Sequence, residues 1–441
     1  MKSKPAKARP VAAKAAAPQS APQGAPGPEV RFRNVLPGDP AIFFRARAAN
    51  NPSFNFDTVG GRYVLLAFIG STVEGSGKRS VELLQKTLDV IDGDRIVAFA
   101  VSVDPRDEQA GAIQADPPRL NVFWDFDLAV SRAYGAAAAE RSPTGEEPYR
   151  PVWYLLDPTL RTLGIFSPPT DDAGVERLRA VIRSLPPSDV HGGMAAQAPV
   201  LFIPRVFEPQ LCKDLIAHYR KHGGEESGFM RDIEGKTTLV LDPNHKRRRD
   251  AQIDDDKLMN AARERIRRRV APEIKKAFQF AVTRIERDIV ACYRAEDSAH
   301  FRAHRDNTTK GTAHRRFAVS INLNDEFEGG TLSFPEYSTH QYKIPAGGAV
   351  VFSCDLLHKV VPVTKGERFA YLPFLYDDAA AKIREENARH LDENVGGYRD
   401  TGAEQRAAEA AARPAKPKKE KAEPAAPKTG PMSFEDDEPV I

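Results

Sequence analysis

The stretch that decides the fold reads IVACYRAEDSAHFRAHRDN (289–307), RFAVSINLNDEFEGGTLSFPE (316–336) and GGAVVFSCDLLHKVVPVTKGERFAYLPFLY (347–376). Short apolar runs with a period of two recur in it, and Gly-Gly, Asn-Asp and Pro-Ala-Gly turns separate them. Many short strands joined by such turns predict a β-sandwich or jelly roll. Helices are expected before it, around 209–223 and 254–278, because apolar residues recur there at helical spacing.

Three side chains of this stretch are candidate metal ligands. His304 and Asp306 form a His-x-Asp pair in a strand-like segment. On a strand, residues i and i+2 point to the same face, so an imidazole and a carboxylate can converge on one ion. His358 ends the later run GGAVVFSCDLLH and can supply a second imidazole. This ligand set leaves open the positions that non-haem Fe(II) uses for a bidentate co-substrate and O₂. A zinc or manganese hydrolase with the same ligands is the alternative.

Arg368 favours the iron interpretation. It follows His358 in the run KGERFAYLPFLY, and an even separation on extended chain places both side chains on one inward face. The expected turn at 364–366 makes this placement approximate. A buried guanidinium needs an anionic partner, and the C5 carboxylate of 2-oxoglutarate, held by two hydrogen bonds, is a suitable one. Tyr293, on a neighbouring strand, is a candidate hydroxyl donor to the same carboxylate. A hydrolase would leave Arg368 unexplained.

Over about 290–377, these blocks resemble the prolyl 4-hydroxylase-type branch of the Fe(II)/2-oxoglutarate dioxygenases. The resemblance implies a double-stranded β-helix, Fe(II) bound by His304, Asp306 and His358, and 2-oxoglutarate bound by Arg368 and Tyr293. It also implies oxidoreductase chemistry, in which 2-oxoglutarate and O₂ are consumed and a substrate C–H is hydroxylated, with ascorbate as a candidate reductant. The substrate would be a prolyl or other side chain of a protein, or a small molecule. His300 and His314 are interpreted as structural or as outer-shell residues of the metal site, and Cys354 as a packed core thiol and not a fourth ligand.

The region 29–185 alternates strands and helices, which predicts an α/β domain. The runs YVLLAFI (63–69), IVAFAVSV (96–103) and VWYLLD (152–157) are continuous and apolar, as expected of strands buried on both faces. A Pro/Gly-rich linker is predicted at 186–200.

Over about 36–166, this region resembles the peroxiredoxin branch of the thioredoxin fold. By that resemblance Arg150 corresponds to the arginine beside the reactive thiol, and Pro151 is a candidate cis proline. Peroxide reduction needs a thiolate in the loop 70–80, yet the first cysteine of the chain is Cys212. The resemblance therefore implies a thioredoxin-like scaffold, a docking module or a homodimer surface instead of a thiol peroxidase.

The catalytic domain is predicted at 201–401, between disordered tails at 1–28 and 402–441 that are rich in Ala, Pro and Lys. Three scattered cysteines and no secretory or membrane-spanning pattern favour a cytoplasmic protein. A net charge of +3 gives no general preference for nucleic acid or membranes. The basic cluster 246–249 is interpreted as a solvated face, or alternatively as a mobile lid over an acidic or polymeric substrate. The loop EGSGKRS (74–80) departs from the phosphate-binding consensus at two positions.

The sequence thus predicts a two-domain Fe(II)/2-oxoglutarate dioxygenase. The alternatives are a catalytically silent binding or scaffold protein and a hydrolase that uses another divalent metal at the same ligands. The primary substrate is left open.

Overall fold

The computed structural model describes residues 31–73, 76–140, 147–393 and 395, so the predicted tails at 1–28 and 402–441 lie outside the described residues. Described residues as far as Asp392 belong to one compact unit. Within it, an α/β part is followed by a part built of further sheets and supporting helices, as predicted. The domain boundaries proposed from the sequence stay predictions.

The α/β part is built on one seven-stranded sheet with the order β2-β1-β5-β4-β3-β6-β7. Its strands are β1 (Arg45–Ala48), β2 (Asn51–Asn55), β3 (Tyr63–Gly70), β4 (Ile96–Ser102), β5 (Leu120–Trp124), β6 (Val152–Leu156) and β7 (Thr162–Phe166). β3, β4 and β5 are parallel neighbours, and every residue of β3 and β4 is buried. Continuous apolar runs form strands that are covered on both faces, and the strands predicted at 63–69 and 96–103 are confirmed.

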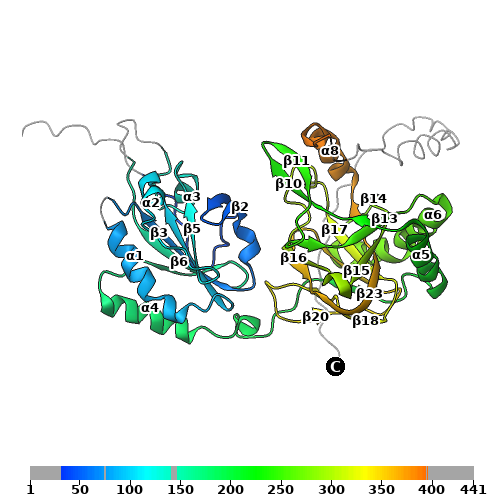
Figure 1. The fold of residues 1–441 in the computed structure, drawn as a ribbon, viewed down its shortest axis with the longest axis horizontal. Helices are drawn as coiled ribbons and strands as arrows, with labels where there is room; N and C mark the ends of the chain where they lie inside the picture. Colours follow the sequence, from blue (N-terminus) through cyan, green and yellow to red (C-terminus); the bar gives the residue numbers. More distant parts are fainter. Residues whose placement is uncertain (1–30, 74–75, 141–146, 394, 396–441) are drawn as a thin grey trace, which may run out of the picture. The chain divides into compact units, whose positions relative to one another are not determined.

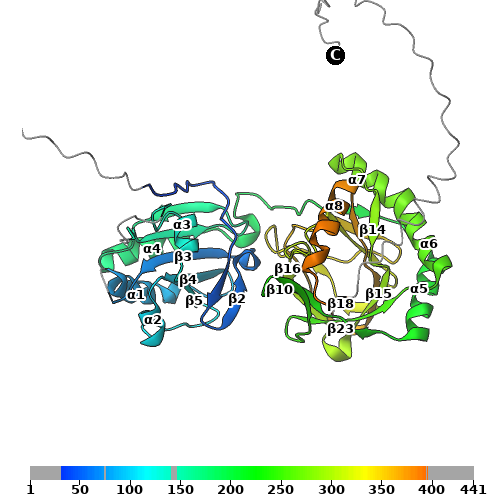
Figure 2. The same cartoon turned by 90° about the horizontal axis from the view of Figure 1, so that it is seen from above.

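Helices cover both faces of this sheet. α1 (Gly77–Lys86) and α4 (Asp172–Ser184) lie side by side and share one apolar cluster with the sheet (Figures 1 and 2). α3 (Ala129–Ala133) packs Val130 into the cluster on the other face, and α2 (Pro105–Gln109) follows β4. The peptide bond before Pro118 is cis, whereas the bond before Pro151 is not among the cis bonds of the described residues. The prediction for Pro151 was therefore wrong.

The second part has a larger sheet, a five-stranded sheet and the hairpin β10-β11. The five-stranded sheet runs β12-β16-β22-β19-β20, and the larger sheet runs β14-β24-β17-β23-β15-β13-β9, with β21, β8 and β18 attached to it. The strands are β8 (Leu201–Ile203), β9 (Glu225–Glu226), β10 (Phe229–Ile233), β11 (Lys236–Val240), β12 (Lys246–Arg247), β13 (Arg249–Gln252), β14 (Arg284–Glu286), β15 (Ile289–Arg294), β16 (His300–His304), β17 (Phe317–Asn322), β18 (Phe327–Gly329), β19 (Leu332–Ser333), β20 (Gln341–Tyr342), β21 (Ala349–Ser353), β22 (His358–Val360), β23 (Val363–Tyr371) and β24 (Phe374–Tyr376).

Helices support the larger sheet from outside. They are α5 (Pro209–His222), α6 (Asp256–Arg265), α7 (Ala271–Phe278) and α8 (Asp378–Asn387). Leu215 of α5 and Val290 of β15 share one apolar cluster with Ile266, which lies in a π-helical turn between α6 and α7. The helix predicted at 254–278 is thus present but is interrupted by that turn. No described helix has the length and apolar character that crossing a lipid bilayer would need.

β23 runs without a break through the turn predicted at 364–366. Its first half pairs with β18 and its second half with β15. Gly366 lies between the halves with a φ of +73°, and a Cβ there would lie 2.5 Å from the Glu326 carbonyl oxygen. Glycine therefore lets the strand bend and continue, and the sequence-based interruption was wrong.

Candidate functional site

Strand pairing brings the three candidate metal ligands together. β16 and β22 are antiparallel neighbours, and His304 lies opposite His358 in their register. Asp306 follows β16, and its backbone N–H donates to the carbonyl oxygen of Cys354. One carboxylate oxygen of Asp306 lies 3.5 Å from His304 Nε2, and the other lies 3.4 Å from His358 Nε2. The ligand atoms of all three side chains lie within 4.8 Å of one another, as a shared cation requires.

Backbone carbonyls fix the orientation of both imidazoles. His304 Nδ1 lies 2.7 Å from the carbonyl oxygen of Arg302, and His358 Nδ1 lies 3.0 Å from that of Leu356. A carbonyl oxygen only accepts, so each Nδ1 carries the hydrogen and each Nε2 offers a lone pair. Metal-binding histidines commonly have this outer hydrogen bond, which selects the tautomer and the ring direction.

The electrostatics of the cluster favour the protonation states that a divalent cation needs. Burial, with the nearby His358, lowers the pKa of His304 to about 4. Burial alone would raise the pKa of Asp306, but the field of His358 and the hydrogen bond with His304 outweigh it and hold that pKa below its usual range. Neutral His304 and ionised Asp306 are ligands at neutral pH without loss of a proton.

Arg368 occupies a buried position on the larger sheet. It lies on β23 directly opposite Tyr293 of β15, and its guanidinium carbon is 5.3 Å from the centre of the tyrosine ring. Its Nε donates to Asn322 Oδ1 at 3.0 Å and its Nη2 to Ser320 Oγ at 2.8 Å. Nη1 is buried and has no hydrogen-bond partner in the described structure. Burial lowers the pKa of Arg368, so an anion beside Nη1 would offset a real cost.

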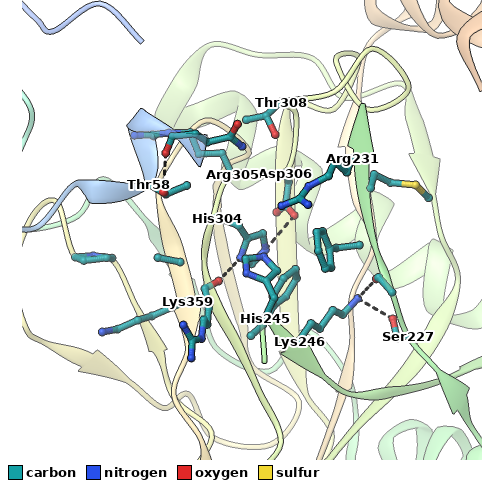
Figure 3. A pocket seen from close by; sticks show the side chains of 18 of the residues that line it. Thr58, Ser227, Arg231, His245, Lys246, His304, Arg305, Asp306, Thr308 and Lys359 are labelled. Carbon is teal, nitrogen blue, oxygen red and sulfur yellow. Dashed lines mark hydrogen bonds and ion pairs between the residues drawn. The ribbon is translucent and has the colours of Figure 1, made fainter. Parts of the chain in front are cut away.

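A second buried arginine lies beside Tyr293, where the sequence predicted a solvated face. Arg248 is 5% exposed, donates to the Tyr293 hydroxyl at 3.3 Å and pairs with Asp250 at 2.6 Å. Lys246 is 4% exposed and donates to Ser227 Oγ at 2.7 Å (Figure 3). The solvated-face interpretation was therefore wrong for Lys246 and Arg248. The signal that could have identified them is their alternation with Asp250 at strand spacing.

A cavity of about 1350 Å³ opens onto two of the candidate metal ligands, His304 and Asp306. Figure 3 shows His304, Asp306 and Lys246 at its wall with Arg231 of the β10-β11 hairpin beside them. Its wall also carries cationic side chains from several elements: Arg231, Lys246, Arg287, Arg302, Arg305, Arg315 and Lys359. Carboxylates also line it, among them Asp57, Glu225, Glu226 and Asp250, so the wall of the cavity is of mixed charge.

Arg305 lies between His304 and Asp306 in the sequence, and buried ion pairs hold its side chain. Its Nη2 lies 2.7 Å from Glu336, and its Nε lies 3.0 Å from Asp57 in the short 3-10 turn Phe56–Val59. His300 and His314, interpreted from the sequence as structural or outer-shell residues, bond to a backbone carbonyl and to Glu286, respectively. Cys354 is buried, as predicted for a core thiol.

Comparison with known proteins agrees with this geometry. Residues 289–376 match the family described as the 2OG-Fe(II) oxygenase superfamily. The PKHD-type hydroxylase azo0608 of Azoarcus sp. (strain BH72) is 33% identical over 105 residues, which cover 22% of this chain and 44% of that protein. The chain therefore spans less than half the length of this relative.

Two solved structures overlap with different parts of the chain. A prolyl hydroxylase from Trichoplax adhaerens, in complex with a hypoxia inducible factor peptide, has a TM-score of 0.34 at 16% identity and covers 43% of this chain and 87% of its own. The peroxidoxin BcpB of Mycobacterium tuberculosis has a TM-score of 0.30 at 17% identity and covers 35% of this chain and 99% of its own. The similarity to the 2OG-Fe(II) oxygenase superfamily, whose description names Fe(II) and 2-oxoglutarate, is confined to residues 289–376.

Proposed function

We propose that this chain is a 2-oxoglutarate- and O₂-dependent hydroxylase that holds Fe(II) on His304, Asp306 and His358. The observation that carries the proposal is Nη1 of Arg368, a buried guanidinium nitrogen without a hydrogen-bond partner in the described structure. The C5 carboxylate of 2-oxoglutarate is an anion that would satisfy this nitrogen. A hydrolase with the same metal ligands would not need a buried arginine with an unpaired nitrogen.

Each neighbouring residue has a separate task in this proposal. Ser320 and Asn322 hold the guanidinium of Arg368 in one orientation through Nη2 and Nε. Arg248 donates to the Tyr293 hydroxyl oxygen, which leaves the tyrosine hydrogen available to the same carboxylate. When bound, Fe(II) and 2-oxoglutarate would allow O₂ to act as the oxidant, with one oxygen atom converting 2-oxoglutarate into succinate and CO₂ and the other converting the substrate C–H into C–OH.

The likeness to a PKHD-type hydroxylase supports hydroxylation as the reaction. We propose a side chain of a protein as the substrate, a prolyl residue among the candidates, because a cavity of about 1350 Å³ exceeds the volume of roughly 300–1,000 Å³ that small-molecule sites usually have. A free small molecule is the alternative. Ascorbate as reductant and a cytoplasmic location complete the proposal.

The finer architecture belongs to the same proposal. The larger sheet and the five-stranded sheet would be the two halves of a double-stranded β-helix. The α/β part would be a thioredoxin-like domain of the peroxiredoxin type without its thiol, serving as a scaffold or as a homodimer surface.

Succinate formation without an added primary substrate tests the proposal against a catalytically silent binding protein. With Fe(II), ascorbate and O₂, we expect the wild-type chain to convert 2-oxoglutarate slowly into succinate. His358→Ala should lower this rate at least about 100-fold, because an essential metal ligand is lost. Arg267→Ala, on an arginine that is 72% exposed, is the control and should keep the rate. A wild-type rate no higher than that of His358→Ala would refute the oxygenase proposal.

A further inference from the structure

A second cluster of metal-ligand side chains is distinct from the three candidate iron ligands, and one of its members, His222, lines the same cavity. His218 and His222 are one turn apart near the end of α5, and Asp254 follows β13. On a helix, residues i and i+4 project from the same face, so the two imidazoles are neighbours. Their ring centres are 4.4 Å apart with an interplanar angle of 21°. Asp254 approaches the pair from a different element, so the cluster joins two segments of the chain.

The distances within this cluster suit a shared cation. Asp254 Oδ1 lies 3.8 Å from His218 Nε2, and Asp254 Oδ2 lies 4.0 Å from His222 Nδ1. All three ligand atoms lie within 4.8 Å of one another. Ligands bound to zinc at about 2.0–2.2 Å are roughly 3.3 Å apart in a tetrahedron. Asp254 is 69% exposed, so its carboxylate can move towards the two imidazoles.

A backbone carbonyl holds the ring of His218 in the metal-free state. His218 is buried, and its Nε2 donates to the carbonyl oxygen of Gln252 at 2.9 Å. A cation bound at Nε2 would take the place of this hydrogen, so the imidazole would have to turn away from the carbonyl. The cluster therefore offers two nitrogens and one carboxylate.

The surrounding charges also favour a cation. Asp255, whose side chain caps α6, follows Asp254 directly, and Asp256 opens that helix. Arg220, Lys221 and Lys257 are exposed cations nearby in the sequence, and their flexible side chains can turn towards solvent.

We propose that His218, His222 and Asp254 bind a divalent cation of the zinc type. Two imidazoles and a carboxylate match the mixed nitrogen and oxygen donors of Zn²⁺, Co²⁺ and Ni²⁺. The bound ion ties the end of α5 to the connection between β13 and α6. Because α5 packs against the larger sheet through Leu215, the site is a stabilising clip separate from the oxygenase centre.

Zinc titration of untagged protein by calorimetry tests this site. The titration is done in the variant His358→Ala, because loss of this ligand weakens zinc binding at the candidate iron site and leaves one dominant binding event. We expect His358→Ala to bind one Zn²⁺. Adding His222→Ala, or in a separate variant Asp254→Asn, should weaken this event more than about 10-fold, since loss of an outer hydrogen bond alone costs 10- to 100-fold. Adding Lys221→Ala, on the same helical turn, should leave it unchanged. Saturating Zn²⁺ should raise the Tm of His358→Ala by about 5–10 °C.

Two outcomes would overturn the proposal. One is that His358→Ala binds no Zn²⁺ and shows no rise in Tm. The other is that the Asp254→Asn and His222→Ala versions bind Zn²⁺ as tightly as their His358→Ala parent. Because the readout is zinc binding in a variant whose central site is disabled, the result does not depend on whether the chain is an oxygenase.

Discussion

The amino group of Lys246 lies in the protein interior. Its hydrogen bonds to Ser227 and Gly228 offset part of the cost of removing it from water. Burial, together with the field of Arg248, lowers the pKa of Lys246 well below its ordinary value. In the unfolded chain a lysine stays protonated up to about pH 10.4. Between the two pKa values the unfolded state binds more protons, so this residue makes the protein more stable as pH rises and less stable as pH falls.

Lys246→Met should remove this dependence while filling the same volume. Relative to the wild-type chain, the variant should gain free energy of unfolding as pH is lowered from about 10 to 7, on top of a constant loss from the missing hydrogen bonds. Urea unfolding of both proteins at several pH values measures the difference. A difference that stays constant across this range would contradict a depressed lysine pKa.

The candidate ligands could be predicted because their chemistry is local, whereas the buried cations could not. The spacing of His304 and Asp306 predicts that they converge, and they do so although Asp306 lies in the turn after β16. Lys246 and Arg248 belong to a basic run that also contains exposed Arg247 and Arg249. The buried members of this run differ from the exposed ones in their interaction partners. Tyr293, the partner of Arg248, comes close only after β13 pairs with β15. Charge counts along the chain contain no information about that pairing.

At the scale of the element, β23 positions the candidate 2-oxoglutarate-binding arginine. It carries Arg368 and bends at Gly366, where the backbone is in the left-handed region. The sequence predicted a break there, because Thr-Lys-Gly is typical of a turn. The strand continues because β18 and β15 pair with successive halves of it. Tertiary pairing of this kind overrides local propensity.

Gly366→Ala should therefore damage both stability and co-substrate binding. We expect a loss of about 2–4 kcal/mol in the free energy of unfolding, combining the strain of a positive φ with a Cβ that would lie 2.5 Å from a carbonyl oxygen. Gly235→Ala is the control, since Gly235 has a φ of +82° but open space at its Cβ position. It should cost only about 1–2 kcal/mol. Equal losses in the two variants would show that the contact with Glu326 is unimportant.

At the scale of the whole molecule, the chain combines an α/β part with a segment similar to the 2OG-Fe(II) oxygenase superfamily, and burial raises the pKa values of its three cysteines. Burial raises the pKa of Cys212 to about 11 and that of Cys292 to about 12, and it raises the pKa of Cys354 well above its ordinary value. All three are buried. The alternation of strands and helices in the α/β part could be predicted from apolar runs, whereas β1 and β2 could not, because their residues are mixed in polarity and become strands only by pairing.

Metal-free protein should therefore show no thiol peroxidase activity. With dithiothreitol and hydrogen peroxide in the presence of a chelator, peroxide consumption by the wild-type chain should equal that of the triple variant Cys212→Ser, Cys292→Ser, Cys354→Ser. The physical reason is that the thiolate, and not the thiol, attacks peroxide. Consumption well above that of the triple variant would mean that one of these cysteines is more accessible than its burial indicates.

Anaerobic titration with Fe(II) and 2-oxoglutarate tests the central claim most directly, with visible charge-transfer absorption as the signal for co-substrate bound at iron. We expect the signal in the wild-type chain and none in His358→Ala. Arg368→Ala should still bind Fe(II) but should lose at least about 30-fold in 2-oxoglutarate affinity, since a charged hydrogen-bonded pair contributes about 2 kcal/mol or more. Unchanged 2-oxoglutarate affinity in Arg368→Ala, or an unchanged signal in His358→Ala, would contradict the account.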